Sequence, residues 1–306
     1  MTLDACLPAH LRGPETTITR MAMGFSGADV YRVEAGGQTF VLKITDRTAA
    51  SDEWRRALRV QQLAAAASLA PQIVHVDEDH RAIVTAFVVD KSFAALFYNP
   101  PTRDTALDLA ATTIKRVHQI PARDSEYRDP LKFLSTLWAP MATDAGVPSF
   151  ARDAIQRLLT EKPPSLDRAM VLSHNDLNPT NVRYDGERVL LLDWDVAALN
   201  DPLYDLATLA MFFRMDDSAC RRLLAAYDGE SSAVLPERFV YNRRLVAVLC
   251  GAAFLGTGTQ GAETLEDTPA LSEIYRRMLS GALNLAAPEG RRAFGLALIK
   301  EGVTRG

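Results

Sequence analysis

Residues 174–193 read HNDLNPTNVRYDGERVLLLD, and this stretch decides the fold prediction. Two short runs, 181–184 and 189–192, flank the dipeptide Asp185-Gly186. Asp-Gly between two such runs is typical of a two-residue β-hairpin turn. We therefore predict a small hairpin here, in a part of the chain whose surroundings are otherwise helical in pattern.

The predicted hairpin brings polar residues together at its open end. A two-residue turn pairs residues whose numbers sum to about 371 here, so Asp193 is expected opposite the loop near Asn178 and within a few residues of Asn181. A carboxylate and an amide oxygen that converge at one point suit a hard cation such as Mg²⁺. Asp176 lies just upstream on the same loop, where it is placed to accept a proton from an attacking hydroxyl group.

A second hairpin is predicted near the start of the chain. Residues 29–34 and 39–45 have the composition of strands and flank Gly36-Gly37. This turn pairs residues whose numbers sum to about 73, which places Lys43 opposite Val30. Lys43 interrupts an otherwise apolar strand, and a charge in that setting needs a partner.

A candidate phosphate-binding loop precedes this second hairpin. Residues 24–28 (GFSGA) place two glycines directly before a strand, where the backbone can approach a ligand closely. The predicted register brings Lys43 near Gly27. We expect Ser26 and Gly27 to contact the phosphates of a nucleotide, within reach of the Lys43 ammonium group.

The rest of the chain divides into a mixed first lobe and a mainly helical second lobe. A helix is predicted over 51–69, and its Glu53 is favoured over Asp52 as the carboxylate that holds Lys43. Further strands are predicted at 72–76 and 82–89, and helices at 104–119 and 150–160. The predicted domains are an N-terminal nucleotide-binding lobe, 1–89, and a C-terminal catalytic and acceptor-binding lobe, 90–306.

The spacing His-x-Asp-x-x-x-x-Asn from His174 to Asn181, followed by a strand that ends in Asp193, is similar to the catalytic and metal loops of protein-kinase-like enzymes. With residues 200–207 (NDPLYDLA), it resembles the aminoglycoside phosphotransferase and choline kinase superfamily, and most closely the bacterial choline and ethanolamine kinases. The resemblance is dense over 171–213. It implies an α+β, bilobal, protein-kinase-like fold with a small antiparallel sheet lobe.

The resemblance also implies roles for individual residues. Asp176 would be the catalytic base of an ATP-dependent and Mg²⁺-dependent phosphotransferase, Asn181 and Asp193 the metal ligands, and Lys43 the contact to the α- and β-phosphates of ATP. Asp195 stands where the family frequently has Glu, so no role is carried over to it.

The same resemblance places the hinge between the lobes at residues 86–89. Backbone groups of Phe87 and Val88 would there recognise the edge of the purine base.

The acceptor is expected to be a small molecule with a hydroxyl group. Choline or a related amino alcohol such as ethanolamine is the first choice. An aminoglycoside or another metabolite is the alternative within the superfamily, and a catalytically inactive nucleotide-binding scaffold is the alternative from another class. A net charge of -4 argues against nucleic-acid binding and favours neutral or cationic partners.

Composition places the chain among ordinary globular proteins. It has 306 residues, of which 48% are hydrophobic and 24% charged, enough to bury a sizeable core. No run of residues is long and apolar enough for membrane insertion, and the first residues lack the order of a signal peptide, so we expect a cytoplasmic protein. Three widely spaced cysteines give no disulfide framework and no Cys-x-x-Cys metal motif, and we expect them to be packing residues.

Overall fold

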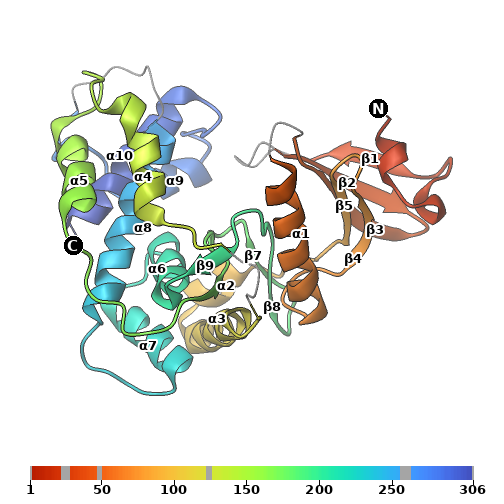
Figure 1. The fold of residues 1–306 in the computed structure, drawn as a ribbon, viewed down its shortest axis with the longest axis horizontal. Helices are drawn as coiled ribbons and strands as arrows, with labels where there is room; N and C mark the ends of the chain where they lie inside the picture. Colours follow the sequence, from red (N-terminus) through yellow and green to blue (C-terminus); the bar gives the residue numbers. More distant parts are fainter. Residues whose placement is uncertain (1, 22–27, 47–49, 122–125, 256–262, 305–306) are drawn as a thin grey trace. The chain divides into compact units, whose positions relative to one another are not determined.

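The structure is a computed structural model that describes residues 2–21, 28–46, 50–121, 126–255 and 263–304 (Figure 1). By its internal contacts the chain divides into two compact units. The sheet unit comprises Met1–Ser125, Leu172–Ala198 and Ala226–Gly229, and the helical unit comprises Glu126–Val171, Leu199–Ala225 and Glu230–Gly306. The predicted boundary between residues 89 and 90 falls inside the sheet unit, and the two predicted domains stay a prediction.

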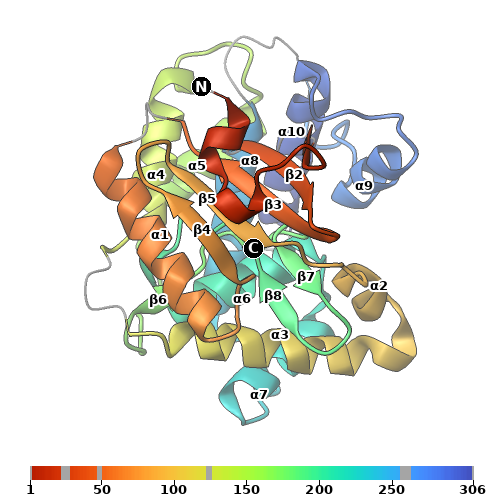
Figure 2. The same cartoon turned by 90° about the vertical axis from the view of Figure 1, so that its right-hand side faces the viewer.

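The sheet unit is built on a five-stranded antiparallel sheet in the order β1-β2-β3-β5-β4 (Figure 2). Its strands are β1 Thr17–Arg20, β2 Asp29–Ala35, β3 Gln38–Ile44, β4 Ile73–Asp77 and β5 Ala82–Ala86. The last four strands were predicted. The first was not, because it is only four residues long and three of them are exposed, which leaves little hydrophobic pattern to detect.

The hairpin of β2 and β3 has the predicted register. Val30 pairs with Lys43, so Lys43 lies near the end of β3, as expected. Gly36 and Gly37 have φ angles of 57° and 74° at the turn. Positive φ at both turn positions is what a two-residue turn of this hand requires, and glycine adopts it without steric cost.

The other elements of the sheet unit are helices and one further hairpin. They are the 3₁₀ segments η1 Leu3–Cys6, η2 Ala9–Leu11 and η3 Pro100–Thr102, the helices α1 Ser51–Ala66, α2 Phe93–Tyr98 and α3 Arg103–His118, and the paired strands β7 Val182–Tyr184 and β8 Val189–Leu191. The predicted helices over 51–69 and 104–119 correspond to α1 and α3, and each ends within a few residues of its predicted boundary.

Apolar side chains cover both faces of the five-stranded sheet. On one face Val84 belongs to a cluster with Cys6 and Leu11 of the N-terminal 3₁₀ segments. On the other face Ile83 packs with Trp54 of α1. Successive residues of a strand face opposite sides of a sheet, so the neighbours Ile83 and Val84 each anchor one layer.

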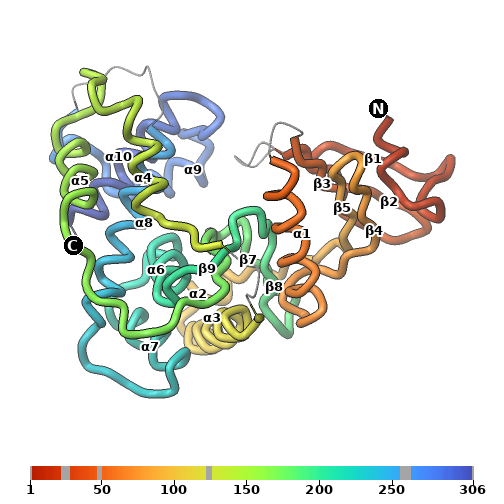
Figure 3. The backbone as a smooth tube through the Cα atoms, in the orientation of Figure 1, coloured from red at the N-terminus to blue at the C-terminus, as the bar shows by residue number. Residues whose placement is uncertain are grey.

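The helical unit is assembled around α8 and α10 (Figure 3). Its helices are α4 Pro130–Trp138, α5 Ser149–Thr160, α6 Pro202–Phe212, α8 Glu237–Leu255, α9 Leu271–Leu279 and α10 Pro288–Thr304, with most of α7 Asp217–Asp228 and the 3₁₀ segment η4 Ala139–Met141. The short strands β6 Val171–Ser173 and β9 Ala198–Asn200 each contain a point where the chain passes from one unit to the other. A Cβ atom on Gly251 would lie 2.7 Å from the backbone oxygen of Gly295, so glycines allow α8 and α10 to approach closely.

These observations confirm the predicted α+β class, with a small antiparallel sheet and a larger helical part. Within the described ranges, none of the helices combines the length and the apolar character that crossing a membrane requires.

Candidate active site

Lys43 is paired with two carboxylates that follow strand β8. Its Nζ atom lies 2.7 Å from Oδ1 of Asp193 and 2.7 Å from Oδ2 of Asp195. The Lys43 side chain is 18% exposed, and the two carboxylates are 28% and 35% exposed. Such partly desolvated ion pairs interact more strongly than surface pairs. This contact brings the end of β3 to the end of β8, although the two segments are far apart in the sequence.

The register of the β7–β8 hairpin places Asp193 close to Asn181. Val182 pairs with Leu191, so the numbers of paired residues sum to 373. The predicted sum of about 371 was wrong by two. The reason is the turn. The backbone N–H of Asp185 donates to the oxygen of Arg188, so the turn is centred on Gly186 and its successor, one residue later than predicted.

The end of this hairpin is held by backbone hydrogen bonds and an unusual backbone conformation. The N–H of Leu192 donates to the oxygen of Asn181 at 2.8 Å. The next residue, Asp193, has a φ of 60°, in the left-handed region that Asp tolerates better than most side chains. The chain therefore turns at Asp193, directly beside Asn181.

Asp176 is oriented by two side-chain amides. Nδ2 of Asn178 donates to Oδ1 of Asp176 at 2.9 Å, and Nδ2 of Asn181 donates to Oδ2 at 2.8 Å. The same Asn181 nitrogen also lies 3.0 Å from the backbone oxygen of Asp176. One donor on each carboxylate oxygen holds the plane of the carboxyl group in a single orientation.

His174 links the loop to the strand end without facing outward. Its side chain is fully buried and packs edge-to-face on Trp194, with ring centroids 4.7 Å apart. The N–H of Asp176 donates to Nδ1 of His174 at 3.3 Å, and Nε2 lies 2.9 Å from the oxygen of Leu192. With Nδ1 accepting one hydrogen bond and Nε2 facing a carbonyl oxygen, His174 acts as a structural link.

The ionisation of the four charged groups follows from burial and from their mutual distances. Burial raises the pKa of Asp176. Burial also acts to raise the pKa of Asp193, but the charge and hydrogen bond of Lys43 outweigh it, and the pKa of Asp193 is lowered. Asp195 shares the same lysine but stays with a raised pKa because burial dominates. Burial acts to lower the pKa of Lys43, but the charges and hydrogen bonds of the two carboxylates outweigh burial, so the pKa of Lys43 is raised.

Asn181 and Asp193 are suited to hold a divalent cation. Because Nδ2 of Asn181 is engaged by Asp176, the amide oxygen points the other way. An amide oxygen and a carboxylate on neighbouring positions are ligands that Mg²⁺ prefers, whereas both ring nitrogens of the nearby His174 are engaged in hydrogen bonds. The residues of this site therefore fit the predicted ion.

The predicted partner of Lys43 was wrong. Glu53 lies on the exposed side of α1, while the neighbouring Trp54 faces the core. Across the described ranges Lys43 forms its ion pairs with Asp193 and Asp195, not with Glu53. The phase of the helix, which the sequence left open, decides this.

The nucleotide-side predictions are only partly described. Ser26 and Gly27 lie outside the described residues. Phe87 follows β5, and its N–H donates to the oxygen of Thr39 at 3.2 Å, which continues the pairing of β3 and β5. Val88 is half-buried in the segment after it. The roles of Phe87 and Val88 stay predictions.

Two residues of the site were missed by sequence reasoning. Asp195 shares Lys43 with Asp193, and Asn178 orients Asp176. The signal for Asp195 was its position only two residues after Asp193, beside the same strand end. The signal for Asn178 was its position two residues after Asp176 in a loop rich in Asn and Asp.

The chain matches the family model described as "Phosphotransferase enzyme family" over residues 17–238 and therefore belongs to that family. Among curated proteins, LicA of Haemophilus influenzae is 36% identical over 59 residues, which cover 19% of this chain and 22% of LicA. The matched part is thus less than a quarter of that relative's length.

Solved structures of choline kinases and aminoglycoside phosphotransferases share the fold. A choline/ethanolamine kinase family protein from Mesorhizobium loti has a TM-score of 0.65 at 20% identity, over 98% of this chain and 95% of the other. Choline kinase LicA from Streptococcus pneumoniae has a TM-score of 0.64 at 14% identity, covering 94% and 92%. An aminoglycoside-3'-phosphotransferase of type VIII has a TM-score of 0.58 at 21% identity, covering 78% and 94%. A LicA structure in complex with AMP matches with a TM-score of 0.62 at 14% identity, covering 97% and 95%.

Proposed function

We propose that this phosphotransferase moves the γ-phosphoryl group of ATP onto the hydroxyl group of choline or a related amino alcohol such as ethanolamine. The observation that carries the chemistry is the arrangement of Asp176, whose carboxylate is held by the amide of Asn181, itself the neighbour of Asp193. This arrangement supports the proposal that Asp176 is the base and that Asn181 and Asp193 hold the divalent cation that phosphoryl transfer requires.

In the proposed reaction, the oxygen of the acceptor hydroxyl group forms a bond to the γ-phosphorus, and Asp176 accepts the proton of that hydroxyl group. The bond between that phosphorus and the bridging oxygen breaks, and ADP leaves. The two amides that hold Asp176 keep its carboxylate aimed in one direction, which supplies positioning. Its raised pKa brings its basicity closer to that needed for accepting a proton.

The charged groups of the site would handle the nucleotide. Lys43 would contact the α- and β-phosphates, and Asp195 and Asp193 hold its ammonium group in place. Asn181 and Asp193 would hold Mg²⁺, which supplies charge neutralisation at the phosphates when it is bound. Ser26 and Gly27 would line the phosphates through their backbone, and Phe87 and Val88 would meet the base.

Choline is preferred as the acceptor on two grounds. The chain carries a net charge of -4, which favours a cationic substrate over an anionic one. The chain also matches a protein named LicA over a short stretch, and a LicA from Streptococcus pneumoniae that shares the fold over 94% of this chain is described as a choline kinase. An aminoglycoside is the second candidate, because a structure of an aminoglycoside phosphotransferase shares this fold over 78% of the chain.

A substrate panel tests the acceptor. The full chain is incubated with Mg-ATP and, in turn, choline, ethanolamine and several aminoglycosides, and the release of ADP is measured. We expect turnover with choline or ethanolamine. Turnover with aminoglycosides alone would replace the choline proposal with the second candidate.

One variant tests whether the chain is an enzyme or a nucleotide-binding scaffold. Asp176→Asn should lower kcat by about 100-fold to 10,000-fold, because it removes the base, and should leave Mg-ATP binding close to that of the unaltered protein. Asp104→Asn, an exposed substitution on α3, is the matched control and should retain full activity. Unaltered turnover in Asp176→Asn would show that the base is misassigned.

A further inference from the structure

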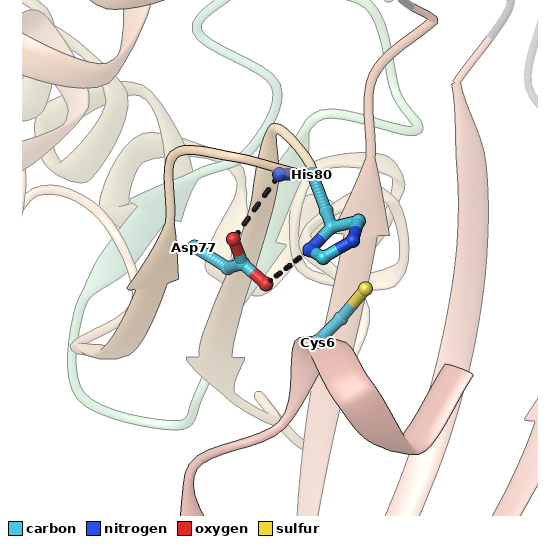
Figure 4. A group of neighbouring side chains, drawn as sticks. All are labelled: Cys6, Asp77 and His80. Atoms are coloured by element: carbon cyan, nitrogen blue, oxygen red, sulfur yellow. Dashed lines mark hydrogen bonds and ion pairs between the residues drawn. The ribbon is translucent and has the colours of Figure 1, made fainter. Parts of the chain in front are cut away.

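Three side chains with metal-binding atoms meet, and none of them belongs to the candidate active site. Cys6 ends η1, Asp77 ends β4, and His80 lies in the turn between β4 and β5 (Figure 4). One potential ligand atom from each residue lies within 4.8 Å of the others. Among the residues that the structure describes, this is the one group of three or more His, Cys, Asp or Glu side chains arranged in this way.

The turn between β4 and β5 preorganises two of the three groups. Oδ1 of Asp77 accepts the backbone N–H of His80 at 3.1 Å, and Oδ2 lies 2.7 Å from Nδ1 of the imidazole. Nδ1 and Oδ2 therefore face the same point, and both could bind an ion that takes the place of the hydrogen between them.

The third group comes from a different part of the chain. The sulfur of Cys6 points toward the imidazole ring (Figure 4), and the Cys6 side chain is fully buried. The side chains of Asp77 and His80 are 15% and 30% exposed, so an ion could enter from their side. The buried thiol and the two partly exposed polar side chains thus lie together.

The donor set selects one class of ion. Sulfur, imidazole nitrogen and carboxylate oxygen together suit Zn²⁺ and related divalent transition metals, whereas Mg²⁺ requires oxygen ligands. A thiolate and a carboxylate also balance the two positive charges of such an ion. The metal would replace the thiol proton of Cys6, which passes to solvent.

We propose that Cys6, Asp77 and His80 bind a divalent transition-metal ion such as Zn²⁺, at a site separate from the Mg²⁺ ligands Asn181 and Asp193. Because Zn–S bonds are about 2.3 Å long and Zn–N bonds about 2.0 Å, the three groups need to close by about 1 Å from the limit of 4.8 Å. Side-chain movement in the exposed turn provides this closure. The ion would join the N-terminal 3₁₀ segment to the turn between β4 and β5.

Cobalt serves as the probe, because a Co²⁺–thiolate bond gives a charge-transfer absorption band and Mg²⁺ sites do not. The full chain, freed of metal by a chelator, is titrated with Co²⁺ in the presence of saturating Mg²⁺. We expect the band to saturate at a single ion per chain and to disappear when Zn²⁺ is added in excess.

Variants locate the ion. Cys6→Ser should abolish the band, and His80→Gln should weaken Co²⁺ binding at least about tenfold. The matched controls are Cys250→Ser, which changes the half-buried cysteine of α8, and His10→Gln, which changes an exposed histidine of η2. Both controls should bind Co²⁺ like the unaltered protein, as should Asp193→Asn, whose position is in the other site.

Cys6 is buried, so its substitution can also disturb folding. The His80 side chain is partly exposed, so His80→Gln tests metal binding without changing the core. Zn²⁺ should raise the thermal unfolding midpoint of the unaltered chain and leave that of His80→Gln unchanged. No charge-transfer band in the unaltered chain, or a band that survives both Cys6→Ser and His80→Gln, would overturn the proposal.

Discussion

The side-chain amide of Asn181 donates a hydrogen bond of 2.8 Å to the carboxylate of Asp176, so a predicted metal ligand holds the predicted base. The same nitrogen also reaches the backbone oxygen of Asp176, at 3.0 Å. The orientation of the base and the direction of the amide oxygen are therefore not independent. A change at either residue should disturb both functions.

This relationship predicts different effects for the two amides around Asp176. Asn181→Ala removes a metal ligand and one hydrogen bond, so kcat should fall at least about 100-fold and the Mg²⁺ concentration for half-maximal activity should rise. Asn178→Ala removes only a hydrogen bond to the base, so kcat should fall about tenfold with an unchanged Mg²⁺ requirement. Steady-state kinetics at several Mg²⁺ concentrations measures both. Equal shifts in the Mg²⁺ requirement would contradict the assignment of Asn181.

The two carboxylates that share Lys43 should also differ. Asp193→Asn keeps the shape of the side chain but removes the charge of a proposed metal ligand, so activity should fall about 100-fold or more. Asp195→Asn leaves Lys43 with Asp193, so the KM for ATP should rise and kcat should fall by about tenfold at most. Kinetics with varied ATP separates these outcomes. A larger loss in Asp195→Asn than in Asp193→Asn would mean that the metal ligand is misassigned.

Tyr241 in the helical unit predicts a pH-dependent stability. Its hydroxyl group is buried, and within the described residues it has no hydrogen-bond partner. Burial raises its pKa to about 12, against an opposing effect of Arg238. Because the folded-state pKa lies above the unfolded-state value, the folded protein is favoured while the phenol is protonated, and this contribution is lost as the pH rises from about 10 to about 12.

Tyr241→Phe tests this prediction. Removing an unsatisfied buried hydroxyl should raise the free energy of unfolding at pH 7 by about 1 kcal/mol. Between pH 9 and pH 11 the free energy of unfolding should also fall less for the variant than for the unaltered protein. Tyrosine in the unfolded chain loses its proton in this range, because its ordinary pKa is about 10. Urea unfolding at several pH values measures both. Parallel curves for the two proteins would exclude a titrating role for Tyr241.

Asp201 should be a strong determinant of the stability of the helical unit. It caps α6 by accepting the N–H of Leu203, and Oδ2 lies 2.7 Å from both Nε of Arg238 and Nδ2 of Asn242. Its side chain is only 3% exposed. Asp201→Ala would leave the buried amide of Asn242 and the partly buried guanidinium of Arg238 without this partner, at a cost of about 3 to 5 kcal/mol in the free energy of unfolding.

The matched control for Asp201 is an ion pair at the surface. Asp217 pairs with Arg243 at 3.1 Å, but the Asp217 side chain is 66% exposed. Asp217→Ala should therefore change the free energy of unfolding by about 1 kcal/mol or less. Similar losses in both variants by urea unfolding would show that burial does not control the contribution of these pairs.

Local patterns were sufficient to predict much of this protein. The register of the β2–β3 hairpin followed from the Gly36-Gly37 turn, because a two-residue turn sets every pair after it. The spacing from Asp176 to Asn181 to Asp193 lies within one short hairpin and its loop, so it could be interpreted without knowledge of the rest of the fold. The turn at Asp185 was misplaced by one residue because several neighbouring positions fit a turn equally well.

What only the tertiary structure decided is which groups meet across long sequence distances. Lys43 lies 150 residues from Asp193, and no local periodicity indicates that these side chains form an ion pair or that Asp195 joins it in place of Glu53. The same is true of Cys6 beside Asp77 and His80. Hairpin geometry depends on neighbouring residues and is encoded locally, whereas such contacts depend on how whole strands and helices pack, through interactions spread over the core.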